Sequence, residues 1–255
     1  DWRWQGKRVL VTGAAGFIGR HLTAHLLGLG ADVSAFVRYN SRGETRLAEL
    51  PGGVDGAAVD VIAGDLKDPQ AVARAVRGRD VVFHLAALIG IPYSYVHPYD
   101  YVQTNTLGTA HVLDACREHG VQKLVVTSTS EVYGTACYVP IDEAHPLQAQ
   151  SPYAASKIAA DQMALSYFRT FDLPVALVRP FNACGPGQSA RAVIPAIITQ
   201  AMAGDTVRLG SLTPRRDLTF VEDTAAGMVR VAEVRESSGE VINLGQGTDI
   251  SIGEL

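Results

Sequence analysis

The strongest constraint on the fold is a regular alternation of short apolar runs with longer helix-like segments. The runs are rich in valine, leucine and alanine and are nearly continuous, without polar residues at every second position. Such strands are buried on both faces, so the pattern predicts a parallel sheet covered by helices on both sides, a doubly wound α/β fold. The predicted strands are residues 8–13, 31–38, 57–65, 80–87, 123–130 and 174–180, and the predicted helices are 17–29, one from 68 onward, 99–119 and 151–171.

After residue 180 the pattern changes to shorter pieces. We expect these pieces to lie at the carboxyl edge of the sheet, where ligands of such sheets bind. The prediction is a first domain at 1–180 and a smaller substrate-binding subdomain at 181–255, with interleaved segments and more chain expected beyond residue 255. The predicted pieces are a helix at 191–204, strands at 206–210 and 217–223, a helix at 224–234 and a strand at 241–245.

Composition excludes several classes of protein. The net charge is −4 and no block of basic residues occurs, so neither nucleic acid nor a membrane surface is an expected partner. No apolar run reaches the roughly 18 residues of a spanning helix, and residues 1–13 do not resemble a signal peptide. The three cysteines, Cys116, Cys137 and Cys184, lack metal-binding spacing and are odd in number. Reduced thiols in a cytoplasmic protein without a metal are the simplest interpretation.

A glycine-rich turn joins the first predicted strand to the first predicted helix. The sequence TGAAGFIG holds Gly13, Gly16 and Gly19. Glycines here let the backbone turn tightly and approach a pyrophosphate, which binds at the positive end of the following helix. The turn therefore predicts a dinucleotide cofactor and a sheet of the Rossmann type. The expected cofactor contacts are Gly13, Ala15, Gly16, Phe17, Ile18, Gly19, Arg38, Ser41, Asp65, Leu66, Leu85, Ala86, Ala87, Tyr153, Lys157 and Pro180.

The end of the second strand bears on the choice between NAD and NADP. An acidic residue there bonds the ribose hydroxyls of NAD, whereas an arginine accommodates the extra phosphate of NADP. This chain has Val37 where the acid would stand, and Arg38, Ser41 and Arg42 follow. A solvated arginine on a loop would give the same sequence, but we expect NAD or NADP with a preference for NADP. Asp65, at the end of the third strand, either bonds the adenine amino group or caps the next turn.

A tyrosine and a lysine stand four residues apart in SPYAASK. This spacing places Tyr153 and Lys157 on one face of the predicted helix. A tyrosine that acts as a base near neutral pH needs its pKa lowered by roughly three units, about 4 kcal/mol. An adjacent ammonium and a nicotinamide cation are the expected sources of that lowering. Thr129 can bond the same substrate oxygen, so the three residues suit hydride transfer at a secondary alcohol.

Six motifs, in order along the chain, resemble one family. They are VTGAAGFIG, HLAA, TSTSEVYG, SPYAASK, RPFN and RRDLTFVED. Together they resemble the extended short-chain dehydrogenase/reductase family, in its nucleotide-sugar epimerase/dehydratase branch. Longer stretches, such as TSTSEVYGTA, are similar to bacterial nucleotide-sugar 4,6-dehydratases of the legionaminic-acid type. The resemblance implies a nucleotide-diphosphate sugar as substrate, a tightly bound and recycled cofactor, and a homodimer formed through helices 99–119 and 151–171.

The resemblance also implies residue roles on the substrate side. A bidentate guanidinium such as Arg216 suits a diphosphate, although an ion pair with Asp217 or Glu222 is the alternative. Asn105 matches an asparagine that fixes backbone near the active site, and a buried structural asparagine would look the same. The expected substrate contacts are Ile89, Asn182, Arg191 and Arg216.

Glu131 separates the possible reactions. Simple C4 epimerases of this branch carry a small neutral residue at its position. After C4 is oxidised the C5 proton is acidic, so a nearby carboxylate can remove it before water leaves from C6. Many dehydratases have an aspartate between the threonine and the glutamate to protonate the leaving hydroxyl, and this chain has Ser130. The triplet resembles that of GDP-mannose 4,6-dehydratases, in which Glu131 would act first as base and then as acid. It also resembles that of UDP-glucuronate decarboxylases, in which the C5 carboxylate leaves as CO₂ and no base is needed.

Dehydration is the preferred interpretation, with decarboxylation, epimerisation of a uronic-acid sugar and a carboxylate without chemistry as alternatives. Similar sequences usually read FNTYGPRQSAR, where this chain has Ala183, Cys184 and Gly187. The change at Gly187 is expected to open space for a different sugar or nucleotide, and Cys184 lacks a histidine partner for covalent chemistry. A non-enzymatic NADP-sensing module and a reductase that consumes free NADPH are two further alternatives. The Tyr153 and Lys157 pair argues against the first, and Glu131 against the second.

Overall fold

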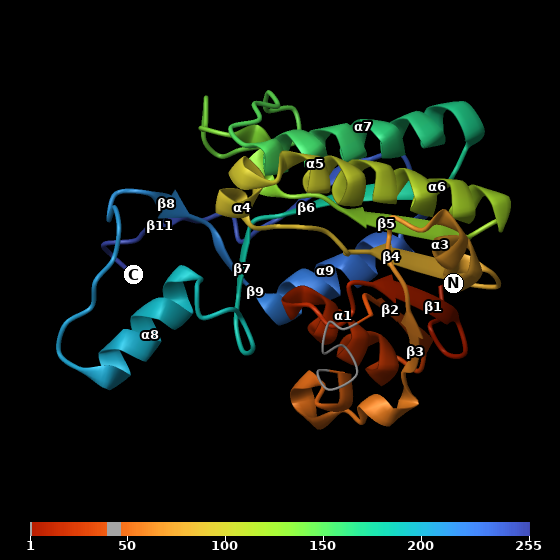
Figure 1. Cartoon of the computed structure of the whole chain (residues 1–255), viewed down its shortest axis with the longest axis horizontal. Helices are drawn as coiled ribbons and strands as arrows, with labels where there is room; N and C mark the ends of the chain where they lie inside the picture. The colour runs from red at the N-terminus through yellow and green to blue at the C-terminus, as the bar shows by residue number, and fades with distance from the viewer. Residues whose placement is uncertain (1, 40–46) are drawn as a thin grey trace.

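The computed structural model describes residues 2–39 and 47–255 and confirms the predicted α/β architecture (Figure 1). Seven parallel strands form one sheet in the order β10-β6-β5-β4-β1-β2-β3. The chain order reverses between β1 and β4, which makes their carboxyl ends the switch point where such sheets bind ligands. The strands are β1 (Arg8–Thr12), β2 (Asp32–Val37), β3 (Asp60–Ala63), β4 (Val81–His84), β5 (Lys123–Thr127), β6 (Val175–Pro180) and β10 (Val241–Leu244).

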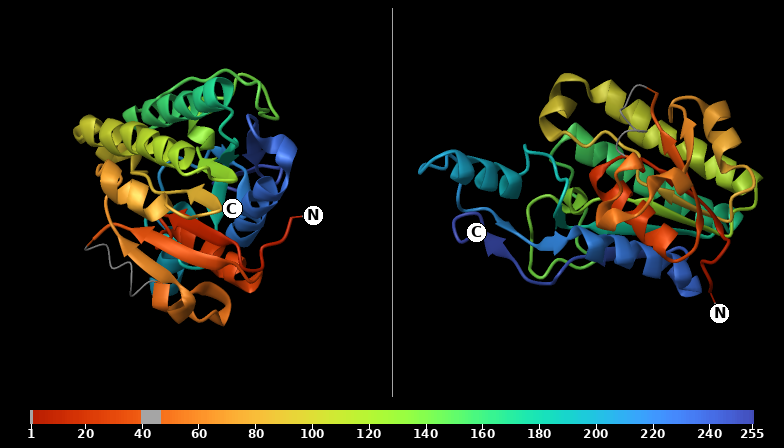
Figure 2. Two further views of the ribbon diagram at one scale, coloured as in Figure 1. Left: turned by 90° about the vertical axis from the view of Figure 1, so that its right-hand side faces the viewer. Right: turned by 90° about the horizontal axis from the view of Figure 1, so that it is seen from below.

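Helices cover both faces of this sheet (Figures 1 and 2). On one face α1 (Phe17–Gly28) and α9 (Val221–Glu233) pack on the sheet through one buried apolar cluster. On the other face α3 (Pro69–Val76), α6 (Gly108–Glu118) and α7 (Pro152–Phe171) form a second cluster. The strands are therefore buried on both sides, which is why their sequences are nearly continuous apolar runs. None of the helices in the described part of the chain is long and apolar enough to cross a membrane.

Several strands are shorter than the sequence predicts, because residues at one or both of their ends form turns outside the sheet. The predicted strand 123–130 ends at Thr127, after which the amide of Ser128 donates one last bond to the Val178 carbonyl at 2.7 Å. Ser130–Tyr133 then form a 3-10 turn, η4, whose cap is the Thr129 hydroxyl. Glu131 therefore lies on a turn beyond the sheet. Likewise 80–87 ends at His84, and 57–65 begins with a 3-10 turn, η2 (Gly56–Ala58).

The predicted helix 99–119 consists of three successive helical pieces. They are α5 (Pro98–Tyr101), a π-helical segment η3 (Val102–Leu107) and α6, and a short helix α4 (Ile91–Val96) precedes them. A π-helical segment within a helix is uncommon and often marks a functional site. Here it carries Asn105, whose backbone carbonyl accepts a hydrogen bond from the Thr109 hydroxyl at 2.6 Å.

Beyond residue 180 the chain divides between the main sheet and a projecting part (Figure 1). Helix α9 and strand β10 pack on and pair with the main sheet. The projecting part holds α8 (Val193–Ala203) and two small sheets, β7 (Asn182–Cys184) with β9 (Leu218–Phe220) and β8 (Arg215–Arg216) with β11 (Ile250–Ser251). The predicted strand 206–210 is wrong: the Gln200 side chain bonds both backbone groups of Arg208, so that segment pairs with a helix end. Two further 3-10 turns are η1 (Pro51–Gly53) and η5 (Arg235–Ser237).

Candidate active site

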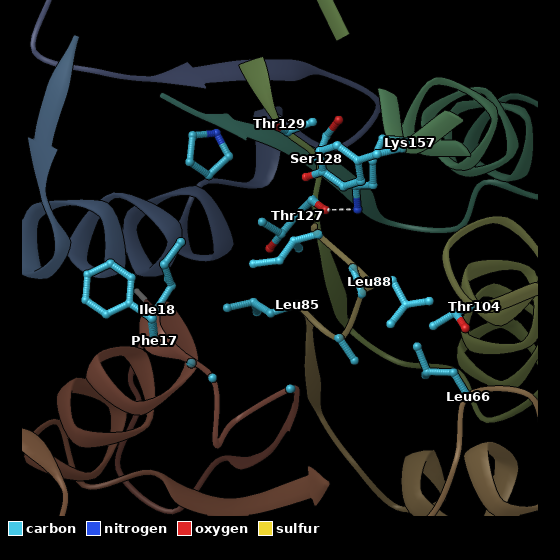
Figure 3. A pocket seen from close by; sticks show the side chains of 18 of the residues that line it. Phe17, Ile18, Leu66, Leu85, Leu88, Thr104, Thr127, Ser128, Thr129 and Lys157 are labelled. Atoms are coloured by element: carbon cyan, nitrogen blue, oxygen red, sulfur yellow. Dashed lines mark hydrogen bonds between the residues drawn. The ribbon is translucent and has the colours of Figure 1, made fainter. Parts of the chain in front are cut away.

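A cavity of about 650 Å³ lies at the carboxyl edge of the sheet, across the switch point between β1 and β4 (Figure 3). The glycine-rich turn and the ends of β2 and β3 form one part of its lining. The end of β5, the turn η4, the first turns of α7 and the segment after β6 form the other part. A site of this size and position suits a dinucleotide together with a second ligand.

The glycine-rich turn leaves no room for side chains where it meets the segment after β4. Gly13 has a φ of +71°, and a Cβ there would lie 2.8 Å from the backbone nitrogen of Ala86. A Cβ on Gly19 would meet the Gly13 carbonyl, so α1 starts directly against the turn. The amides of Leu85 and Ala86 both donate to the Thr12 hydroxyl at 3.1 Å, which fixes this close approach. The result is a backbone-lined cradle at a helix N-terminus, which fits a pyrophosphate group.

We predict that Gly13→Ala weakens cofactor binding and the fold together. The left-handed backbone and the clash with Ala86 should lower the free energy of unfolding by about 1–3 kcal/mol. Gly28→Ala, on the last residue of the same helix with open space around it, is the matched control and should leave stability unchanged or slightly raised. Thermal unfolding with and without NAD would measure both, and equal behaviour of the two variants would contradict the prediction.

His84 stabilises the start of the glycine-rich turn through its contacts with two threonine hydroxyls. Its Nδ1 lies 2.8 Å from the Thr12 hydroxyl and its Nε2 lies 3.0 Å from the Thr109 hydroxyl. Complete burial, with a smaller contribution from the charge of Lys157, lowers the pKa of His84 to about 3. The ring is therefore neutral at working pH and acts as a fixed hydrogen-bonding spacer between β1, β4 and α6.

The expected cofactor residues gather on this cavity. All of them line it except Ser41, which lies outside the described residues, as does Arg42. Arg38 is exposed at the rim beside Val37. Asp65 caps the next turn by accepting from the Lys67 amide at 2.9 Å, and it also lines the cavity.

Sequence reasoning missed several lining residues. Thr127 and Ser128 belong to the motif TSTSEVYG, so this motif could have identified them as lining residues. Of the remaining residues, Phe181 and Gln188 lie in quoted motifs, and the others carry no local signal. These others are Phe36, Gly64, Lys67, Leu88, Ile91 and Thr104.

The tyrosine and lysine of α7 face the end of β5, as predicted. Ser151 caps the helix and Pro152 opens it, which places Tyr153 in the first turn. The Thr129 hydroxyl is near enough to the Tyr153 phenol to lower its pKa by hydrogen bonding. The ammonium of Lys157 donates to the Thr127 carbonyl at 2.6 Å (Figure 3). Thr129, Tyr153 and Lys157 are thus brought together at one wall of the cavity.

The protonation of Tyr153 differs from the expectation that a neighbouring ammonium lowers its pKa. Burial raises the pKa of Tyr153 to about 12, the hydrogen bond from Thr129 lowers it, and the charge of Glu131 raises it again. Burial likewise lowers the pKa of Lys157. Because Lys157 bonds to a backbone carbonyl, its effect on Tyr153 is weaker than the spacing alone suggested. The residues of this chain therefore hold Tyr153 as a neutral phenol.

Glu131 and Ser130 both line the cavity from the turn η4. The amide of Glu131 donates to the Thr129 hydroxyl at 3.2 Å, which fixes the start of the turn. The Glu131 side chain is half-buried, and its charge acts on the Tyr153 phenol, so the two groups face the same space. Within residues 2–39 and 47–255, no hydrogen bond or ion pair holds the Glu131 carboxylate.

Two of the four expected substrate contacts line the cavity and two do not. Ile89 and Asn182 line the cavity, whereas Arg191 and Arg216 are exposed and do not. Arg191 precedes the projecting α8, and the Arg216 guanidinium donates to the neighbouring Arg215 carbonyl at 2.8 Å. The alternative ion pair with Asp217 or Glu222 is not found either. Asp217 instead accepts from the backbone amides of residues 246 and 247.

Asn105 has the geometry that the resemblance implies. Its Oδ1 accepts from the Leu88 amide at 2.8 Å, and its Nδ2 donates to the Leu88 carbonyl at 2.9 Å and to the Ser156 hydroxyl at 3.0 Å. It therefore ties the segment after β4 to α7. At the loop after β7, the Arg20 guanidinium occupies the space where a side chain on Gly187 would begin, so this glycine does not open the cavity. Cys184 does not line the cavity, and no cluster of metal ligands occurs among the residues that the structure describes.

Comparison with known proteins identifies the family of this chain. Over 252 residues the chain is 36% identical to the dTDP-glucose 4,6-dehydratase of Streptomyces antibioticus, covering 97% of this chain and 74% of that protein. It is 34% identical to the UDP-glucose 4-epimerase of Mycolicibacterium smegmatis, covering 97% and 80% of the two chains. Among solved structures, DesIV, a dTDP-glucose 4,6-dehydratase from Streptomyces venezuelae with NAD and TYD bound, superposes with a TM-score of 0.85 at 33% identity, covering 96% and 77%.

These relatives include both dehydratases and epimerases, so they fix the class of protein and leave the reaction to the site itself. The NAD dependent epimerase/dehydratase family matches residues 9–245, which is most of the chain. The chain belongs to the NAD dependent epimerase/dehydratase family.

Proposed function

We propose that the protein is a nucleotide-sugar 4,6-dehydratase. The observation that carries the proposal is the Glu131 carboxylate, which faces the same space as the Tyr153 phenol and has no partner among the described side chains. A carboxylate without a hydrogen-bond partner, beside the base that acts on the C4 hydroxyl, is suited to removing the proton at C5. The dTDP-glucose 4,6-dehydratases among the relatives support the same reaction.

In the proposed reaction this chain moves two protons. Tyr153 accepts the proton of the sugar C4 hydroxyl, while the Thr129 hydroxyl bonds to the same oxygen and orients it. Glu131 then takes the C5 proton, made acidic by the C4 ketone, and returns it to the hydroxyl that leaves C6 as water. Ser130, next to Glu131 on the cavity wall, is placed to bond that leaving hydroxyl. When bound, the nicotinamide cofactor would take the C4 hydride and deliver it to C6 after water has left, while C5 takes up a proton from solvent, and its positive charge would favour the Tyr153 phenolate.

On the substrate side, Asn182 and Ile89 line the cavity and are the proposed sugar-nucleotide contacts. The proposal that Arg216 joins Asn182 in holding the diphosphate, with Arg191 as a further substrate contact, requires the projecting part of the chain to move toward the cavity.

The proposal is tested by incubating the protein with UDP-GlcNAc, UDP-glucuronate, GDP-mannose and dTDP-glucose, each with NAD or NADP, and measuring product masses. Loss of one water from any of them supports dehydration. Loss of CO₂ from UDP-glucuronate alone would replace it with decarboxylation. An unchanged mass with a new sugar isomer would mean epimerisation, the reaction named for the epimerase among the relatives.

For the cofactor, we propose that Arg38 gives the protein a preference for NADP within an NAD-dependent family. Arg38 lines the rim of the cavity, and no carboxylate follows β2 at Val37. We predict that Arg38→Ala weakens NADP binding about tenfold and leaves NAD binding nearly unchanged, because only the extra phosphate bonds the guanidinium. Calorimetric titration with both cofactors measures this, and equal losses for NAD and NADP would assign Arg38 another role.

We further propose a cytoplasmic homodimer that joins through the predicted helices 99–119 and 151–171. Several large apolar side chains in the first of these helices and in the segment just before it are exposed, and exposed apolar side chains gathered in one segment suit an interaction site. They are Tyr93, Tyr95, Val96, Tyr99, Val102 and Leu107. Light scattering on the purified protein measures the mass, and a monomer at micromolar concentration would refute the dimer.

A further inference from the structure

Three consecutive residues at the end of β5 each bond to a different residue on α7. Tyr153, Lys157 and Asp161 stand on successive turns of one helix face. Thr129 bonds to Tyr153, and the Thr127 carbonyl accepts from Lys157. Between them, the Ser128 hydroxyl donates to the Asp161 carboxylate at 2.8 Å. The proposed reaction uses Thr129 and Tyr153, and the connection between Ser128 and Asp161 has no part in it.

Asp161 is held in turn by a buried arginine from the neighbouring strand β6. The Nη2 and Nε of Arg179 donate to Asp161 Oδ2 at 3.0 and 3.2 Å. The Asp161 side chain is 0% exposed and that of Arg179 3% exposed, so the pair is shielded from solvent. The Arg179 Nη1 donates to the Tyr133 hydroxyl at 3.0 Å, and that hydroxyl donates to Asn243 Oδ1 on β10 at 2.7 Å. The connection therefore runs from β10 through β6 to the end of β5.

Stability alone does not explain this arrangement. Desolvation of a buried ion pair commonly offsets its Coulombic gain, and apolar replacements of similar volume are often as stable. In addition, the second carboxylate oxygen, Asp161 Oδ1, is buried without a hydrogen-bond partner among the described residues. Burial raises the pKa of Asp161, and Arg179 and Ser128 oppose that shift. The Asp161 carboxylate lies one helical turn beyond Lys157, and its burial costs free energy. Its presence is therefore better explained by the groups that it orients than by a gain in stability.

We propose that Asp161, oriented by Arg179, is a positioning residue that holds Ser128 and thereby sets Thr127 and Thr129 against Lys157 and Tyr153. The proposal rests on the proposed function, because it concerns the groups that act at C4. Ser128 is the middle residue of the three, so a shift of its side chain displaces the neighbours on both sides. Misplacement of reacting groups by about 1 Å can lower a rate by about 100-fold.

The charge of Asp161 gives this role a specific signature. Asp161 contributes to the raised pKa of Tyr153, so replacing it by a neutral residue should lower that pKa. Other groups facing Tyr153 stay in place in such a variant. They are Glu131 on η4 and Tyr101 on α5, with Lys157 one turn further along α7.

The test compares Asp161→Asn, Asp161→Glu and Ser128→Ala in the protein loaded with NAD, using the nucleotide sugar that the wild type converts. For Asp161→Asn we expect kcat to fall about 100-fold with little change in KM. The acid limb of its kcat/KM profile should also move to lower pH, and Asp161→Glu should return that limb to its wild-type position. Ser128→Ala keeps every charge, so it should lower kcat about tenfold and leave the limb in place. Ser166→Ala, on the exposed face of α7, is the matched control and should match the wild type.

A second readout needs no substrate and separates this proposal from the proposed function. The difference in phenolate absorbance between the wild type and Tyr153→Phe reports the titration of Tyr153, and the same difference is measured in the Asp161→Asn background. A lower midpoint in that background supports the proposal even if no nucleotide sugar is turned over, which would overturn only the proposed function. An unmoved midpoint, or full kcat in Ser128→Ala, overturns the positioning role. If Asp161→Asn does not fold, the kcat of Ser128→Ala decides.

Discussion

Glu131→Gln should abolish the loss of water from the nucleotide sugar, with a rate about 10²- to 10⁴-fold lower. Glutamine keeps the size and the backbone bond from residue 131 to the Thr129 hydroxyl, but it cannot accept the C5 proton. The Glu131 charge also raises the pKa of Tyr153, so its removal should make proton transfer at C4 easier at neutral pH. A loss of dehydration in Glu131→Gln would therefore report the proton transfer at C5 and not the proton transfer at C4.

Mass spectrometry of reactions in heavy water measures this step directly. The wild type should incorporate deuterium from solvent into its product, and Glu131→Gln should give neither deuterium incorporation nor product. The matched control is Glu118→Gln, an exposed carboxylate at the end of α6 far from the cavity, which should behave like the wild type. Full dehydration by Glu131→Gln would remove this residue from the reaction and favour decarboxylation or epimerisation.

Tyr153→Phe should lower turnover about 10²- to 10⁴-fold for every reaction that begins at C4, whether dehydration, decarboxylation or epimerisation. Phenylalanine fills the same buried space but offers no group to accept the C4 hydroxyl proton. The effect is thus independent of the substrate, and it tests the enzyme class where Glu131→Gln tests the reaction.

The pH dependence follows from the raised pKa of Tyr153. Only the phenolate accepts a proton, so activity should fall as the pH drops below the pKa of this group, giving an acid limb. Thr129→Val removes the hydrogen bond that lowers the pKa, so its limb should move to higher pH. This is the opposite direction from Asp161→Asn. A limb that stays fixed in Thr129→Val would show that another group controls the profile.

The raised pKa of Tyr153 should lower the folding stability of the protein at alkaline pH. Folding raises the pKa of Tyr153 from about 10 to about 12, so the folded state is at no disadvantage below pH 10. Between about pH 10 and 12 the unfolded chain ionises first, and this residue's contribution to stability is lost. Tyr153→Phe should therefore unfold less readily than the wild type in that window, as alkaline denaturation followed by circular dichroism would show.

The sequence by itself determined the features that depend on near neighbours. The apolar runs predicted β1, β2, β4, β5 and β6 because a strand covered on both faces must be apolar throughout. The glycine turn was predictable because only glycine suits the left-handed backbone of Gly13 and its approach to Ala86. The pairing of Tyr153 with Lys157 followed from helix periodicity alone.

Tertiary structure decided whatever depends on residues far apart in the chain. The strand after Thr127 ends early because η4 turns it away, and Arg216 misses the cavity because β8 pairs with β11 in the projecting part. Lys157 bonds to the Thr127 carbonyl, 30 residues away, so its effect on Tyr153 could not be read from their spacing. Ser128 and Asp161 stand 33 residues apart, and Arg179 reaches Asp161 from a different strand. Hydrogen-bond partners at such distances are selected by how α7 packs on β5 and β6, and a sequence pattern records only that these segments are buried, not which of their polar groups meet.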